Sequence, residues 1–477
     1  MVLKDKNSLS VTILATLQTS VFLAIFFLGN LRQNIETFLF LVIPLSIFYL
    51  ANLLFLKEAE LSPKSFFLIL GLGILIRLFF LFSEPTLSDD IFRYVWDGKI
   101  FALGQNPYEF APNSDSLKVF RDSEIYPFIN HKEIPTVYPP ILQLIFAINS
   151  FLSATVFGMK FLILLFEFGL SFLVYKILIL LNEKKEYFFF YFLNPLAILE
   201  FSGQGHSDVI GIFFIFLGIY FFLIFLPTKK HEKKEDTIPA KLGIHSYFPI
   251  IFITFAGLVK FIPFAFLPFF RKGRTFKGIA LALGIVILLY LPFVEIGSKL
   301  LAGFFAYSKN WSFNESIFAL LKNGLIFLGL KTDKALEIGS LTLENPARDF
   351  SKLIILVTWG ITWLFLFWKN PKSESKLETV KTIFILLVLY LLLTPTLQPW
   401  YLIWILPFLA IWRYFSFLLL SCLILISYYV LKDYSSLGIW KEELWVSLVQ
   451  YVPFYLILFW EVFKNKSLVL DSKSPKV

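Results

Sequence analysis

Long apolar runs constrain this chain more than any other feature of its sequence. Of its 477 residues, 57% are hydrophobic and 16% are charged, whereas soluble proteins average about 45–50% and about 25%. The excess falls in runs of about 17–25 residues, the length that an α-helix needs to cross a bilayer. The first three runs lie near residues 9–29, 36–56 and 65–82. The pattern predicts an all-α, polytopic integral membrane protein with about 12–14 membrane elements.

Basic residues cluster between the apolar runs and predict the orientation of the protein. The net charge of +9 therefore fits the positive-inside rule of membrane proteins, and we expect no nucleic-acid partner. Basic clusters at 229–234 and 271–274, together with lysines near both ends of the chain, mark the inner side. We expect a multi-pass plasma (inner) membrane protein with both termini in the cytoplasm. The only cysteine, Cys422, excludes an intramolecular disulfide and a cysteine-based metal site.

Three segments depart from simple spans. Residues 83–138 are long, rich in proline and aromatic residues, and predicted outside as a folded extracytoplasmic loop of short helices. Residues 247–270 are interrupted near Lys260, which predicts two half-helices, because broken backbone is tolerated where it lines a cavity. Residues 187–203 and 208–226 are expected to form an outward hairpin. We divide the chain into an N-terminal transmembrane hairpin (1–64), a core (65–300) and a C-terminal part (301–477) that begins with a second outer segment.

Asp89 and Asp90 are the strongest candidates for chemistry. They stand at the outer edge of the third apolar run, where acidic residues are costly and usually functional. A carboxylate in such a position can act as a general base toward a hydroxyl group. The alternative is that they cap a surface helix that starts near Ile91.

Other polar residues map to the same outer side, except for one buried cation. His206 and Asp208 form a tight tip, and two ligands are too few for a metal, so phosphate or sugar hydroxyls are the expected ligands. Lys260 could bind phosphate as a point charge, or could form a structural ion pair with Glu167 or Glu200.

Two arginines also have structural alternatives. Arg93 could belong to a salt-bridged helix with Asp97. Arg77, near the end of the third run, is expected to extend its head group to the interface.

Several short motifs follow one another along the chain. They are Ser88-Asp89-Asp90-Ile91-Phe92-Arg93-Tyr94-Val95-Trp96-Asp97-Gly98, Gly104-Gln105-Asn106-Pro107-Tyr108, Tyr138-Pro139-Pro140, Gly205-His206-Ser207-Asp208, Lys260-Phe261-Ile262-Pro263 and Pro395-Thr396-Leu397-Gln398-Pro399-Trp400-Tyr401. In this order they resemble motifs of bacterial GT-C glycosyltransferases, in particular the polyprenyl-phosphate-mannose-dependent mannosyltransferases. The resemblance covers about residues 65–415. Gln398 stands where many relatives carry histidine.

The resemblance implies a GT-C-like fold and an inverting transfer of one sugar, with mannose expected, from a polyprenyl phosphate to a lipid or glycan hydroxyl on the extracytoplasmic face. Asp90 is our first choice as base, because its spacing from Tyr94 best matches the family loop, and Asp89 is second. Lys260, His206 and Arg93 are expected at the donor phosphate. The expected substrate-binding residues are Asp208, Trp96, Asn106, Tyr108, Tyr138, Gln398, Trp400 and Tyr401.

Alternatives stay open at this point. We expect no cofactor and no metal, but Asp89, Asp90 and Asp208 could supply oxygen ligands to a divalent cation. A lipid or sugar transporter or flippase would also carry broken helices and intramembrane charges. A surface-polysaccharide polymerase or ligase would share the chemistry and differ in its donor.

Overall fold

The computed structural model describes residues 2–225, 244–270, 275–330, 336–338, 341–369 and 375–464. Within these ranges, nine helices are long and apolar enough to cross a membrane, and four shorter apolar helices accompany them. The predicted all-α, polytopic membrane fold is therefore confirmed. The basic clusters at 229–234 and 271–274, on which the predicted orientation partly rests, lie outside the described residues.

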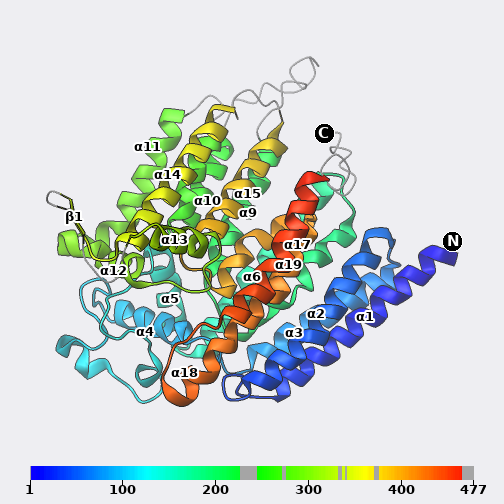
Figure 1. Cartoon of the computed structure of the whole chain (residues 1–477), viewed down its shortest axis with the longest axis horizontal. Helices are drawn as coiled ribbons and strands as arrows, with labels where there is room; N and C mark the ends of the chain where they lie inside the picture. The colour runs from blue at the N-terminus through cyan, green and yellow to red at the C-terminus, as the bar shows by residue number, and fades with distance from the viewer. Residues whose placement is uncertain are drawn as a thin grey trace.

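Long helices form the body of the molecule (Figure 1). Helices α1 to α3 pack together at one side of it, and the first three apolar runs match them closely. Eight of these nine spans fall on α1 (Val2–Phe27), α2 (Ile35–Glu58), α3 (Pro63–Leu81), α6 (Val156–Leu180), α9 (Asp208–Phe225), α11 (Thr275–Tyr290), α14 (Pro346–Lys369) and α19 (Leu444–Phe463). The ninth covers Phe415–Leu437, and α15 (Lys376–Leu393) is a further long helix.

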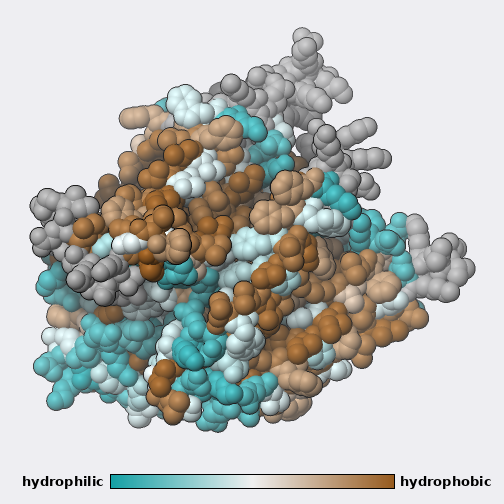
Figure 2. Space-filling model, in the orientation of Figure 1, coloured by the Kyte–Doolittle hydropathy of each residue, from teal (hydrophilic) through white to brown (hydrophobic). Residues whose placement is uncertain are grey.

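Residues 83–138, predicted as the first outer loop, are folded, as expected. They contain α4 (Asp90–Ala102) and the short 3-10 helices η1 (Asp115–Phe120) and η2 (Tyr126–Phe128). A helix that the sequence did not reveal, α5 (Pro140–Leu152), follows the loop and packs on α4. Figure 1 places α4 and α5 at the end of the bundle that lies away from the two termini. Hydrophilic residues gather over this end, while the flanks of the bundle are hydrophobic (Figure 2).

The segment before the His206 tip is broken rather than a single span, which corrects the expectation for residues 187–203. The break falls at Asn194, whose side chain accepts hydrogen bonds from the N–H groups of Leu196 and Ala197, because proline follows it and cannot continue a helical ladder. The pieces are η3 (Lys185–Phe188), α7 (Phe189–Phe192), α8 (Pro195–Ala197) and the π-helix η4 (Ile198–Gly203).

The two half-helices predicted around Lys260 are present as α10 (Phe248–Gly257), preceded by η6 (Ile244–Tyr247), and η7 (Ile262–Phe270). The second outer segment contains η8 (Leu291–Leu301), α12 (Ala302–Asn310), α13 (Ile317–Phe327) and a small antiparallel pair, β1 (Leu336–Ile338) and β2 (Leu341–Leu343). The late elements are α16 (Pro399–Leu402), η10 (Ile403–Ala410), α17 (Phe415–Leu423), η11 (Ile424–Val430) and α18 (Leu431–Leu437).

A buried ion pair joins α3 to α6 beneath the site. Arg77 and Glu167 are both fully buried, with 2.7 Å between guanidinium and carboxylate. Ser202 of η4 donates a hydrogen bond to the same carboxylate at 3.1 Å. The expectation that Arg77 extends to the membrane interface is therefore wrong. Its guanidinium instead pairs with the buried carboxylate of Glu167.

Gly98 sets how closely α4 lies on α5. A Cβ atom added there would meet the carbonyl oxygen of Phe146 in α5, which is backbone and cannot move aside cheaply. We predict that Gly98→Ala lowers the free energy of unfolding by about 1–3 kcal/mol through overpacking and shifts the thermal unfolding midpoint downward.

Gly71 provides the matched control. It lies within α3, and an added Cβ would meet nothing within 4 Å. Gly71→Ala should leave the unfolding midpoint unchanged or raise it slightly, because alanine has the higher helix propensity. Equal midpoints for the two variants would contradict the close approach of α4 to α5.

Candidate active site

The tip between η4 and α9 brings polar side chains into an apolar bundle. Gly205 turns the chain there with φ +74°, a conformation that other residues rarely adopt. A Cβ at this position would also meet the side chain of Ile91 in α4. The tip therefore packs directly against the first turn of the helix that carries Asp90.

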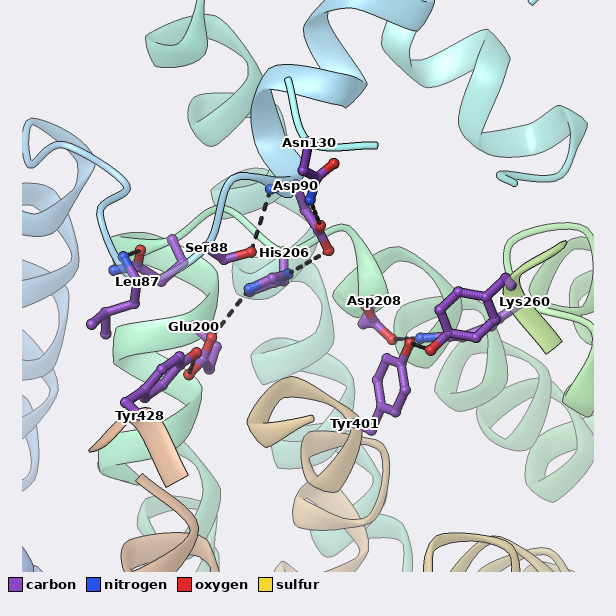
Figure 3. A network of polar contacts seen from close by, with 12 residues as sticks. Leu87, Ser88, Asp90, Asn130, Glu200, His206, Asp208, Lys260, Tyr401 and Tyr428 are labelled. Atoms are coloured by element: carbon purple, nitrogen blue, oxygen red, sulfur yellow. Dashed lines mark hydrogen bonds and ion pairs between the residues drawn. The ribbon is translucent and has the colours of Figure 1, made fainter. Parts of the chain in front are cut away.

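Asp90 is held at the start of α4 with both carboxylate oxygens facing polar groups (Figure 3). Its Oδ1 accepts a hydrogen bond from Asn130 at 3.1 Å, and its Oδ2 lies 3.9 Å from Nδ1 of His206. Its backbone N–H donates to the hydroxyl of Ser88 at 3.3 Å. Because the Asp90 side chain is 24% exposed, a hydroxyl substrate can approach it.

Asp89 has a different role from Asp90. It occupies the N-cap position of α4, yet its side chain makes no capping hydrogen bond. Its carboxylate instead pairs with Arg32 at 2.7 Å, and Arg32 also donates to the backbone carbonyl of Thr86 at 2.8 Å. Arg32 comes from the turn between α1 and α2, where it is the only charged residue, so the N-terminal hairpin holds the segment that leads into Asp90.

His206 is almost completely buried and is fixed on three sides. Its ring stacks on Trp400, with centroids 3.8 Å apart and an interplanar angle of 15°. Its Nε2 lies 3.3 Å from a carboxylate oxygen of Glu200, while Nδ1 faces Asp90. Both ring nitrogens face carboxylates, so this geometry favours a role beside Asp90 over the predicted contact with a donor phosphate.

Lys260 lies in the break between α10 and η7 and reaches Asp208. The ammonium is 2.5 Å from the Asp208 carboxylate, which also accepts a hydrogen bond from the indole N–H of Trp404 at 2.6 Å. The Tyr401 ring lies 3.7 Å from the ammonium, and the Tyr401 hydroxyl is 2.6 Å from that of Tyr307.

The structural partner of Lys260 is therefore Asp208 rather than Glu167 or Glu200. With 32% of its side chain exposed, Lys260 can also meet a ligand.

Arg93 and Trp96 are built into the loop rather than directed at an open site. Arg93 pairs with Asp97 at 2.7 Å and donates to the carbonyl of Ile134 at 2.9 Å, the salt-bridged arrangement given above as its alternative. Burial raises the pKa of the Asp97 carboxyl, although Arg93 opposes that effect. Trp96 is 1% exposed and packs on Tyr126, a position that leaves its ring no face for a sugar.

Tyr94, whose spacing from Asp90 singled out that aspartate, lies close to the charged groups of the site. It is buried, and its ring stacks on Phe146. Burial raises the pKa of its hydroxyl well above the usual range, and the negative charges of Asp90 and Asp208 raise it further. Tyr94 therefore keeps its proton and lies within the field of both carboxylates.

The remaining predicted substrate residues shape the surroundings of the site. The side chain of Asn106 accepts the N–H of Tyr108 at 3.0 Å, and the Tyr108 hydroxyl donates to the carbonyl of Tyr138 at 2.7 Å. The Tyr138 ring meets Tyr94 edge-on. Gln398 is half-buried just before α16. Their contacts to a substrate stay predictions.

The structure brings no metal-binding cluster together in the part of the chain that it describes. No group of three His, Cys, Asp or Glu side chains in those ranges could hold a metal ion. Asp89 and Asp208, which could have supplied oxygen ligands, each have a cationic partner. The predicted independence from metals stays a prediction.

The family assignment follows from a comparison with protein-family models. The model described as "alpha-(1->6)-mannopyranosyltransferase, N-terminal domain" matches residues 35–273. The chain belongs to this family. It is thus an integral membrane glycosyltransferase of a mannosyl-transferring family, which favours an enzyme over a transporter or flippase. No curated protein and no solved structure matches the chain.

The matched region covers only part of the candidate site. The matched residues include Asp90, His206, Asp208 and Lys260. Arg32 lies before the matched region, and the segment that carries Trp400 lies after it. The candidate site therefore also includes contacts from residues outside the matched region.

Arg32 provides a test of the role of the N-terminal hairpin. Arg32→Gln removes the charged partner of Asp89, and we predict a roughly 3- to 10-fold fall in kcat, the scale of about 1 kcal/mol for a partly exposed pair. Donor KM should change little. Lys432→Gln is the matched control, because it breaks an exposed ion pair with Glu36 on the same hairpin. Equal losses in both variants would show that Arg32 has no specific effect on the site.

Proposed function

We propose that this mannosyltransferase moves one mannose from a polyprenyl-phosphate donor to a lipid or glycan hydroxyl on the extracytoplasmic face, with inversion at the anomeric carbon. The observation that carries the proposal is the placement of Asp90, a partly exposed carboxylate with both oxygens facing polar groups at one end of an apolar bundle. The 1→6 linkage in the family's description leads us to propose a primary hydroxyl as the acceptor.

Asp90 would act as general base in a direct displacement. The acceptor oxygen attacks the anomeric carbon, its proton passes to the Asp90 carboxylate, and the bond from that carbon to the phosphate oxygen breaks. The electron pair of the broken bond leaves with the lipid phosphate. One carboxylate at the attacking oxygen suffices for an inverting reaction, since no covalent sugar intermediate forms.

Lys260 would neutralise the departing phosphate. Its ammonium is already directed at an anion, the Asp208 carboxylate, and is partly exposed. A phosphate can take the place of that carboxylate while Trp404 keeps its hydrogen bond to Asp208. Because charge builds up on the leaving oxygen in the transition state, a fixed cation there accelerates the reaction.

Replacement of the base is the first test. Asp90→Asn in purified, lipid-reconstituted protein should lower transfer from polyprenyl-phosphate mannose by roughly 100-fold or more, with donor KM nearly unchanged. Asp89→Asn should have a smaller effect, because Asp89 is tied to Arg32. Asp115→Asn, an exposed change in the same outer loop, should have none. Full activity of Asp90→Asn would refute the mechanism, and exclusive use of an oligosaccharide-diphosphate donor would favour a polymerase or ligase.

The phosphate role of Lys260 is tested with its partner. Lys260→Met should raise donor KM and lower kcat, but it also leaves Asp208 with a buried charge, which costs about 3–5 kcal/mol of stability. The double variant Lys260→Met/Asp208→Asn removes both charges and should recover the unfolding midpoint without recovering activity. If activity returns together with stability, Lys260 has a structural role only.

A further inference from the structure

A buried carboxylate beside the site has no part in the transfer reaction described so far. Glu200, in the π-helix η4, is completely buried. One of its oxygens accepts a hydrogen bond from the hydroxyl of Tyr428 at 2.8 Å. The other has no hydrogen-bond partner in the described part of the chain and lies 3.3 Å from Nε2 of His206. A carboxylate buried in an apolar bundle is costly, so its position calls for a function.

The imidazole of His206 connects Glu200 to Asp90 (Figure 3). Its plane is set by the stacking on Trp400, and its backbone N–H donates to the carbonyl of Glu200 at 3.0 Å. One ring nitrogen then faces Glu200 and the other faces Asp90. Which nitrogen of a histidine carries a proton depends on the partner of the opposite nitrogen.

We propose that Glu200 is a positioning residue for the base and acts through His206. By holding Nε2, Glu200 fixes the ring so that Nδ1 stays directed at one oxygen of Asp90, while Asn130 holds the other oxygen. Asp90 is hydrogen-bonded at one oxygen, and its other oxygen lies 3.9 Å from the ring of His206. These two neighbours restrict the orientation that the carboxylate presents to the attacking hydroxyl, and such alignment contributes to rate. This inference rests on the proposed function of Asp90.

The backbone at Glu200 supports the inference independently. Residues Ile198–Gly203 form a π-helix, a rare structure that occurs frequently at functional sites. The wider turn carries Glu200 in the same short segment as the tip that carries His206. Regular helix would change the direction of the Glu200 side chain relative to the tip.

The experiment combines variants of the two carboxylates. Glu200→Gln keeps the shape of the side chain, and we expect kcat to fall about tenfold, about 1.4 kcal/mol, with donor KM within about twofold. In the Asp90→Asn background the same substitution should have no further effect, because residues that act as a unit are not additive. His206→Asn should behave like Glu200→Gln, and the double variant should be no worse than either one. Glu186→Gln, a buried glutamate in η3, is the matched control and should keep wild-type kcat.

Two results would overturn the inference. One is wild-type kcat in Glu200→Gln; the other is a tenfold loss that recurs in the Asp90→Asn background, which would mean a structural role only. If Glu200→Gln does not fold, Glu200→Asp carries the test, because it keeps the charge but shortens its reach and should also lower kcat without changing donor KM. Full activity of Asp90→Asn alone would instead refute the proposed function.

Discussion

A charged side chain inside an apolar helical bundle needs polar or oppositely charged partners, and this constraint shapes the protein. Arg77 lies against Glu167, Arg93 against Asp97, and Lys260 against Asp208. Removing one partner of such a pair leaves an uncompensated charge that costs several kcal/mol. The pairs therefore fix how α3 packs on α6, how α4 is braced, and how the Lys260 break meets the tip at α9. The candidate site lies between these segments.

Segments far apart in the sequence supply the residues of the candidate site. The segment that carries Trp400 is held in place by the predicted second outer segment. Phe313 forms a short parallel bridge with Thr396, and its backbone exchanges hydrogen bonds with Pro395 and Leu397. That contact holds the chain just before Gln398, from which α16 places Trp400 on His206. Residues outside the matched region thus contact residues of the candidate site inside it.

The helices and their breaks could largely be predicted from the sequence, whereas the side chains that pair with one another in the site could not. The long apolar runs and the half-helices at Lys260 follow from bilayer length and helix-breaking residues. The predicted topology places Asp90 and His206 on one side, and only the resemblance implied that Lys260 joins His206. The break at Asn194 was missed because the apolar run hides its Asn-Pro signal. Which side chains meet depends on how each helix is rotated about its axis relative to its neighbours, and this rotation cannot be derived from a single sequence by simple rules. The residues overlooked for this reason as parts of the site are Arg32, Asn130, Glu200, Trp404 and Tyr428.

The account predicts a direct displacement in which one carboxylate activates the acceptor and a cation receives the leaving phosphate. The most direct measurement is the anomeric configuration of the mannose before and after transfer, read by NMR from a single-turnover reaction of the reconstituted enzyme with a donor of defined configuration. Opposite configurations in donor and product are the predicted result, because a single displacement inverts the carbon that is attacked. Retained configuration would contradict the account, since a single in-line displacement cannot produce it.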